Sequence, residues 1–290
     1  MKRLTKIVLW IFLILAAATG FVAYKYPAAI MALLVSSKGY YNQENHVYGQ
    51  LPRQRYDLYI PHDVKTDAPL LVFFYGGGWS MGDKALYRFV GRAFASRDII
   101  VAIPNYRVYP DVIFPTFMQD AAAAVSKIES EVRAKYGNRH KLFLSGHSAG
   151  AHIAALLALD KSYLKAQNFD APKITGVIGL SGPYDFLPLT EDKYKKIFPE
   201  NVRNASQPIN FVSGKMPPML LITGTSDTVV KPANTEHLVA KINASGGKAQ
   251  IVLYEGVGHY GTVLSLYDRW LSSNMDVQQD IMSFIEVQAK

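Results

Sequence analysis

Cysteine is absent from this chain of 290 residues, and charges of one sign never gather in a long block. Without cysteine the chain can form no disulfide, thiolate-ligated zinc site or iron–sulfur cluster, and it has no thiol nucleophile. The net charge of +8 comes from 31 Lys and Arg against 23 Asp and Glu, and these cations are dispersed rather than interleaved with aromatic residues. This pattern predicts no nucleic-acid partner.

Long hydrophobic runs are also scarce, and only residues 7–24 approach the length of a membrane-spanning helix. The cations ahead of this run, which are Lys2, Arg3 and Lys6, predict a cytoplasmic N-terminus. The run continues past the small residues at 16–18, which favours an uncleaved signal anchor. Cleavage near those small residues would instead make the segment a signal peptide.

The chain is therefore expected to have three parts. Residues 1–26 form the signal anchor or signal peptide, residues 27–44 a juxtamembrane segment, and residues 45–290 the folded domain. The predicted orientation places this domain outside the cytoplasm, on the periplasmic side of a membrane. A cleaved leader would leave it secreted.

Short apolar runs that end at glycine or proline recur from about residue 56 onward, as is typical of buried parallel strands. They cover residues 56–60, 70–75, 99–103, 142–144, 177–180, 219–222 and 250–254. Segments with helical spacing lie among them, at 86–95, 116–136, 149–159, 232–243 and 276–287. This alternation predicts an α/β fold, with a mostly parallel sheet of about eight strands and helices on both faces. Residues 184–218 lack a clear strand and are expected to form a small insertion, or cap, after the sixth strand.

The strongest motif is Gly-His-Ser-Ala-Gly at residues 146–150, between a predicted strand and a helix of small residues. This strand–turn–helix setting is the one that the G-x-S-x-G motif requires. The turn is too tight for flanking side chains, and it lifts the hydroxyl of Ser148 out of the sheet edge. Ser148 is the predicted nucleophile.

A serine nucleophile needs a base, and the base needs an acid that orients it. Asp227 follows the strand at 219–222 and is the predicted acid, although Ser226 and Asp185 could compete. His259 follows the last strand and is the predicted base, because none of the six other histidines lies beyond that strand. The order Ser, Asp, His at successive strand ends is the order of this hydrolytic triad.

His147 and His152 flank the serine and are expected to pack around the turn rather than to transfer protons. No pair of histidines has metal-ligand spacing with an acidic partner, so we predict no catalytic metal.

A glycine loop, Tyr-Gly-Gly-Gly-Trp at residues 75–79, follows the strand at 70–75. Backbone amides in such a loop can donate to an oxyanion. The loop lacks the lysine of a phosphate-binding loop and the glycine spacing of a dinucleotide fingerprint, so we predict no cofactor.

From about residue 45 onward the chain resembles the α/β-hydrolase superfamily, and within it the bacterial carboxylesterases related to hormone-sensitive lipase, feruloyl esterase and kynurenine formamidase. The residues that carry the resemblance are 75–79, Asn-Tyr-Arg at 105–107, Phe-Pro at 114–115 with Asp120, residues 146–152, Asp227 and His259. The resemblance implies a Ser148–His259–Asp227 triad and an oxyanion hole formed by Gly77, Gly78 and the amide of Ala149. The family usually has histidine where this chain has Tyr75, a position that shapes the loop.

The sequence thus predicts a serine carboxylic-ester hydrolase that forms an acyl-enzyme with a small-molecule ester. An aryl formamidase or a feruloyl-type esterase with the same triad is the alternative, and a non-catalytic interaction protein on this fold is a third. The membrane is a predicted partner through the N-terminal segment. Oligomeric state is not readable from the sequence.

Overall fold

The computed structural model describes residues 39–170, 173–267 and 275–290. The predicted anchor at residues 1–26 lies outside these residues, as does most of the predicted juxtamembrane segment. In the described part of the chain, no helix is long and apolar enough to cross a membrane.

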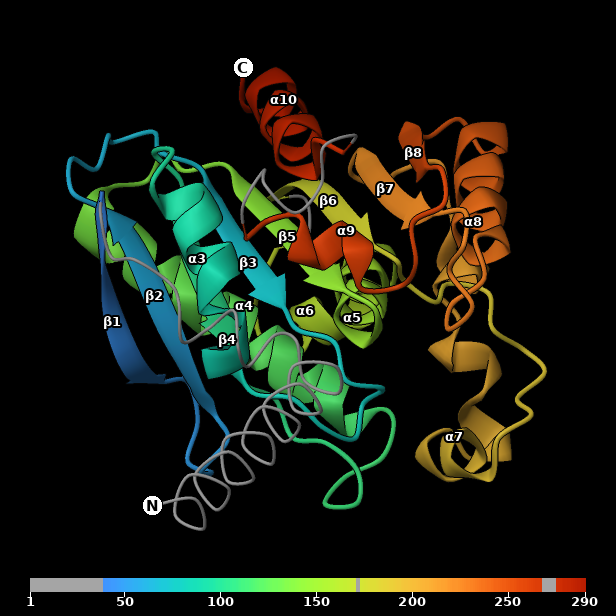
Figure 1. The fold of residues 1–290 in the computed structure, drawn as a ribbon. Helices are drawn as coiled ribbons and strands as arrows, with labels where there is room; N and C mark the ends of the chain where they lie inside the picture. The colour runs from blue at the N-terminus through green and yellow to red at the C-terminus, as the bar shows by residue number, and fades with distance from the viewer. Residues whose placement is uncertain (1–38, 171–172, 268–274) are drawn as a thin grey trace, which may run out of the picture.

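A single eight-stranded sheet organises the described residues, in the order β1-β2-β4-β3-β5-β6-β7-β8 (Figure 1). The strands are β1 Tyr40–Val47, β2 Arg55–Pro61, β3 Leu70–Phe74, β4 Ile100–Pro104, β5 Leu142–His147, β6 Ile174–Leu180, β7 Met219–Gly224 and β8 Ala249–Tyr254. β1 and β2 pair antiparallel, as do β2 and β4, while the neighbours from β4 to β8 run parallel. The carboxyl ends of the parallel strands therefore meet at one edge of the sheet.

Helices cover both faces of this sheet (Figure 1). They are α3 Arg88–Ala95, α4 Thr116–Tyr136, α5 Ala149–Leu159, α6 Ser162–Lys165, α7 Asp192–Ile197, α8 Ala233–Ala244, α9 Gly261–Leu264 and α10 Val277–Ala289. The predicted helices at 116–136 and 149–159 agree with α4 and α5 at both ends. The predicted helix at 86–95 is split, because a 3₁₀ turn, Lys84–Tyr87, precedes α3.

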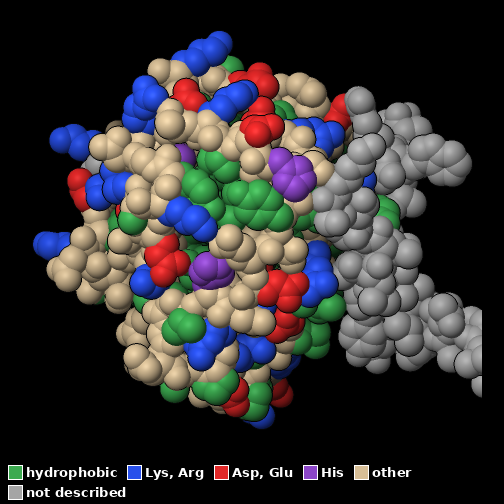
Figure 2. All heavy atoms as spheres, turned by 90° about the vertical axis from the view of Figure 1, so that its left-hand side faces the viewer, with side chains coloured by type: hydrophobic (Ala, Val, Ile, Leu, Met, Phe, Trp, Pro, Cys, Tyr) green, Lys and Arg blue, Asp and Glu red, His purple; other side chains and the backbone are tan. Residues whose placement is uncertain are grey.

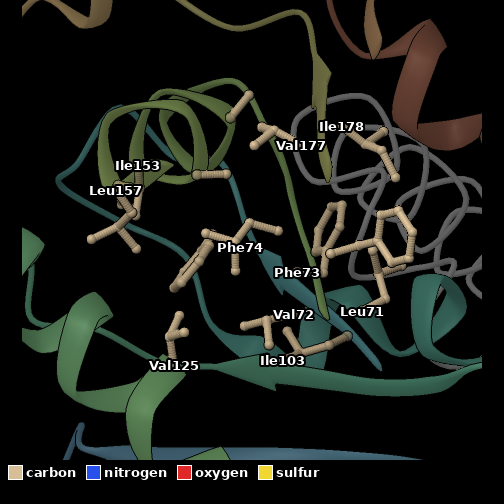
Figure 3. Packing of buried hydrophobic residues seen from close by; sticks show 14 of the residues in the cluster. Leu71, Val72, Phe73, Phe74, Ile103, Val125, Ile153, Leu157, Val177 and Ile178 are labelled. Carbon is tan, nitrogen blue, oxygen red and sulfur yellow. The ribbon is translucent and has the colours of Figure 1, made fainter. Parts of the chain in front are cut away.

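The central strands are buried on both faces, which explains their continuous apolar runs. Figure 3 shows Phe74 of β3 beside Val125 of α4 and Ile153 of α5, while Leu71 and Phe73 point to the opposite side. On that opposite side, the ring of Phe143 meets the α10 residue Phe284 at 6.3 Å between centroids. Alternate side chains of a strand thus point to opposite faces of the sheet, and helices pack on each of these faces.

The edge strand β1 was not predicted from the sequence. Its sequence YYNQENHV is largely polar and exposed, so it lacks the apolar pattern of the inner strands. Residue 45, where the folded domain was expected to begin, falls inside this strand. Figure 2 shows the side of the molecule at the left of Figure 1, where Lys and Arg are interspersed with Asp and Glu. On this face the charges are dispersed, in agreement with the sequence pattern.

The predicted insertion lies between β6 and β7 and contains α7 with three 3₁₀ turns, Glu200–Val202, Asn204–Ser206 and Pro208–Phe211. Figure 1 places α7 beyond the carboxyl ends of the parallel strands. The insertion therefore covers the sheet edge at which the predicted site residues converge.

Candidate active site

Ser148 occupies a sharp turn between β5 and α5. Its φ of 54° and ψ of −122° are unusual for a residue with a side chain. The flanking glycines permit this turn: a Cβ atom on Gly146 would lie 2.3 Å from the carbonyl carbon of Gly150. A Cβ atom on Gly150 would lie 2.0 Å from the carbonyl oxygen of Phe74. A larger residue at Gly146 would force β5 away from α5, and one at Gly150 would force α5 away from the end of β3.

Ser148, His259 and Asp227 form a continuous hydrogen-bonded chain. Nε2 of His259 lies 2.9 Å from Oγ of Ser148, and Nδ1 lies 2.8 Å from Oδ2 of Asp227. The exposed fractions of the three residues are 9%, 6% and 4%. Because a carboxylate only accepts, the proton of the neutral imidazole lies on Nδ1, and Nε2 is left to accept from the serine hydroxyl.

The carboxylate of Asp227 is held by its surroundings. Burial disfavours its charge, but hydrogen bonds from His259 and from the amides of Val229 and Val230 outweigh that effect, and the pKa of Asp227 is lowered. The alternative acid, Asp185, instead pairs with His237 at 2.8 Å. The structure therefore brings Asp227, and not Asp185, to the candidate base.

The glycine loop faces the serine across a cavity that Gly77, Gly78 and Ser148 all line. Gly77 has φ of 137° and Gly78 has φ of 57°, both in the region that favours glycine. Within the described residues, the amides of Gly77 and Gly78 donate to no protein acceptor. Ala149 is the first residue of α5, so its amide has no acceptor within the helix. Three amide donors are thus available around Ser148.

A family model described as BD-FAE matches residues 56–242, which is more than half of the chain. The chain belongs to the BD-FAE family. Together with named esterases among its relatives, this match identifies it as a member of an α/β-hydrolase carboxylesterase family.

Two curated proteins are similar in sequence to most of this chain. Isoprenylcysteine alpha-carbonyl methylesterase ICME of Arabidopsis thaliana is 32% identical over 265 residues, which are 83% of this chain and 61% of that protein. Esterase LipC of Mycobacterium tuberculosis is 28% identical over 248 residues, covering 76% of this chain and 60% of that protein. This chain thus spans about three fifths of the length of each of these relatives.

A solved structure confirms the predicted α/β-hydrolase fold. Esterase B from Lactobacillus rhamnosis superposes with a TM-score of 0.77 at 20% identity, and the match covers 95% of each chain. At this level of identity the comparison establishes the fold.

Tyr75, at the position where the resemblance implied histidine, is held in the core of the protein. Its ring stacks on Tyr106 at 4.7 Å, and its hydroxyl accepts a hydrogen bond from Nη2 of Arg53 at 2.8 Å. The same guanidinium donates to the carbonyl oxygens of Gly82 at 2.8 Å and Tyr106 at 2.9 Å. Arg53 thereby joins Tyr75, the first residue of the glycine loop, to Gly82 beyond the loop and to Tyr106 after β4. Sequence reasoning missed Arg53, since an arginine before an early strand carries no motif.

His147 and His152 pack around the turn at Ser148, as the sequence predicted. Nε2 of His147 donates to the backbone oxygen of His259 at 3.1 Å, and burial lowers the pKa of His147 to about 3. Nε2 of His152 donates to the backbone oxygen of Ser206 at 2.7 Å, and burial lowers its pKa to about 4. Nδ1 of His152 accepts from the indole of Trp79 at 3.3 Å. Both rings are neutral at pH 7, and they join the turn to the base and to the insertion.

The cavity above Ser148 has a volume of about 520 Å³ and is mainly apolar. One wall comes from the glycine loop and α9, and the other comes from the insertion. Its apolar side chains outside the triad include Trp79, Met81, Leu86, Phe186, Leu189, Tyr194, Val229, Tyr260 and Leu264. Such a cavity suits a small organic molecule that carries one reactive polar group.

Proposed function

We propose that this protein is a serine carboxylic-ester hydrolase that works through an acyl-enzyme. The observation that carries the proposal is the hydrogen-bonded chain Ser148–His259–Asp227 at the floor of an apolar cavity. His259 accepts the serine proton through Nε2 while Oγ attacks the ester carbonyl carbon. The imidazolium then gives that proton to the leaving alcohol. Water releases the acyl group by the same route.

The amides of Gly77, Gly78 and Ala149 are the proposed oxyanion hole. Charge develops on the carbonyl oxygen as the carbon becomes tetrahedral, and donors fixed in advance stabilise it without reorganisation. Each such donor contributes about 10²- to 10³-fold to kcat. Asp227 holds the Nδ1 tautomer of His259 and stabilises the imidazolium.

A carboxylic ester is the substrate class that we favour. The curated relatives are named as a methylesterase and an esterase, which supports oxygen esters of small alcohols. The cavity, at about 520 Å³, accommodates a small acyl or aryl group. An aryl formamide or a feruloyl ester would use the same chemistry and is the second candidate.

Labelling with a fluorophosphonate tests the nucleophile directly. We expect covalent labelling of the wild-type protein, none of Ser148→Ala, and normal labelling of the matched control Ser245→Ala at the end of α8. Labelling of folded Ser148→Ala that maps to Ser145 or Ser181 would overturn the assignment. A panel of chromogenic esters of increasing acyl length, together with N-formylkynurenine, then separates esterase from formamidase.

The triad acts as a unit, so the losses in kcat caused by substituting its members do not add up. Ser148→Ala, His259→Ala and the double variant should each lose about 10⁴- to 10⁶-fold in kcat. Asp227→Asn should lose less, because nucleophile and base both remain. Near-normal turnover by His259→Ala would assign the base to another residue.

We also propose that residues 1–26 anchor the protein in a membrane with the enzyme on the periplasmic side. The support is the charged start followed by the apolar run at 7–24. Full-length protein should remain with membranes through a high-salt wash. A mature N-terminus that maps near residues 16–20 would replace the anchor with a cleaved signal peptide and a secreted protein.

A further inference from the structure

One charged side chain enters the cavity above Ser148. Among the described residues that line it, Lys193 is the only Lys, Arg, Asp or Glu, and the remaining walls are apolar or carry backbone and uncharged polar groups. Lys193 lies on α7 of the insertion, which is not part of the hydrolase sheet.

The ammonium of Lys193 lies over the glycine loop. A Cβ atom placed on Gly78 would be 3.7 Å from its Nζ and 3.3 Å from the hydroxyl of Tyr194. The same Nζ lies 5.5 Å from the centroid of the Tyr194 ring. The ring of Tyr194 also packs edge-on against Trp79 of the glycine loop, at 5.9 Å between centroids. Lys193 and Tyr194 of the insertion therefore both lie next to this loop. The cation therefore faces the space that a bound ester occupies.

In the part of the chain that the structure describes, no carboxylate pairs with this cation. Within the described residues, no Asp or Glu oxygen lies within 4.0 Å of its Nζ. The acidic residue beside it on α7, Asp192, pairs with Lys195 at 3.0 Å. A cation that pairs with no carboxylate among the described residues, set among apolar walls, interacts with an opposite charge more strongly than it would in bulk water.

The oxyanion is not the natural partner of Lys193, because Gly77, Gly78 and Ala149 already offer amides to that atom. An anionic group elsewhere on the substrate is the partner that the cavity lacks. We propose that Lys193 is a specificity-determining residue that selects esters bearing a carboxylate near the scissile bond. This inference rests on the proposed esterase function and adds a substrate class to it.

Pairs of charged and neutral substrates test the inference. They also show whether the preferred carboxylate lies on the acyl or the alcohol side of the ester. On the acyl side, an aryl monoester of succinate is compared with the aryl ester of a neutral acid of equal length. On the alcohol side, 4-carboxyphenyl acetate is compared with phenyl acetate. The measured quantity is the ratio of kcat/KM for the anionic ester to that for its neutral partner.

Lys193→Met should lower this ratio about tenfold for one of the two pairs, the size expected for one charge-assisted contact. Lys193→Glu should lower it further, through like-charge repulsion. The matched control Lys196→Met, at an exposed position of the same helix, should keep the wild-type ratio. Raising the ionic strength should reduce the wild-type ratio and leave that of Lys193→Met unchanged.

Equal losses for the charged and neutral esters in Lys193→Met would overturn the inference, since they would indicate a role in the oxyanion hole or in folding. An unchanged ratio would overturn it as well. Failure of the proposed function looks different: no ester is hydrolysed by the wild-type protein, and Ser148 is not labelled by a fluorophosphonate.

Discussion

Replacing Tyr75 by phenylalanine should separate the stability of the glycine loop from its chemistry. The change keeps the ring that stacks on Tyr106 and removes the hydroxyl that accepts from Nη2 of Arg53. That guanidinium retains its bonds to the carbonyl oxygens of Gly82 and Tyr106. A partly buried, charged N–H of Arg53 and the amide of Tyr106, which donates to the same hydroxyl at 3.4 Å, both lose this acceptor. The loss of the charged contact costs about 1.5–3 kcal/mol.

For a domain of this size, that loss lowers Tm by roughly 3–12 °C. Because the stacked ring still supports the loop, kcat for a chromogenic ester should fall by less than about tenfold, which is about 1.4 kcal/mol. Tyr75→His, which introduces the residue that the resemblance implied at this position, loses the same hydroxyl and should also stay within about tenfold in kcat.

Thermal unfolding and steady-state kinetics of Tyr75→Phe, Arg53→Met and the double variant form the assay. If the hydroxyl acts through Arg53, the double variant should lose little more stability than Arg53→Met alone. Tyr41→Phe on the exposed edge strand is the control and should change stability by less than about 0.5 kcal/mol. Additive losses, or an unchanged Tm in Tyr75→Phe, would refute the reasoning.

Gly77→Val places a Cβ atom 2.2 Å from the backbone oxygen of Met81, so the loop must shift. Steady-state kinetics should then show kcat reduced by about 10²- to 10³-fold. An unchanged kcat would mean that Gly77 is not part of the oxyanion hole. His152, whose pKa is lowered to about 4 in the folded protein, binds its proton in the unfolded chain from about pH 6.5 downward. Stability should therefore fall as the pH drops from about 6.5 towards 4, and urea unfolding of His152→Gln should show a flatter profile over that range. Lys84→Met removes the ammonium that pairs with the buried carboxylate of Asp57 at 2.7 Å. Chemical denaturation should show a loss of about 3–5 kcal/mol in the free energy of unfolding. A loss below about 1 kcal/mol would mean that water reaches this carboxylate.

The sharp turn between β5 and α5 could be predicted from the sequence because its constraints are local. Close approach of β5 to α5 admits only glycine at residue 146, and close approach of α5 to the end of β3 admits only glycine at residue 150. Both requirements appear directly in the motif. The inner parallel strands, from β3 to β7, were also predictable, since burial on both faces leaves uninterrupted apolar runs. β1 escaped prediction for the opposite reason: as an edge strand with polar side chains, it shows neither an apolar run nor a clear alternation.

Contacts between distant segments could not be read from the sequence. Arg53 supports a loop more than twenty residues further along the chain, and Lys193 reaches the same loop from the insertion. Neither residue belongs to a motif, and each side chain alone is typical of a solvated surface. Only the folded chain shows that the first is tied to the loop and that the second faces the cavity.

The link from Trp79 through His152 to Ser206 bears on how such enzymes can be re-engineered. A foreign insertion grafted between β6 and β7 would remove the carbonyl group that His152 binds at 2.7 Å and leave a buried N–H without an acceptor. The graft would also remove Phe198, whose ring packs against the indole of Trp79 at 4.8 Å between centroids. The insertion is consequently not an exchangeable module, because its inner surface is part of the support of the glycine loop. Libraries aimed at new substrates should vary the residues of the insertion that line the cavity and keep its buried anchors unchanged.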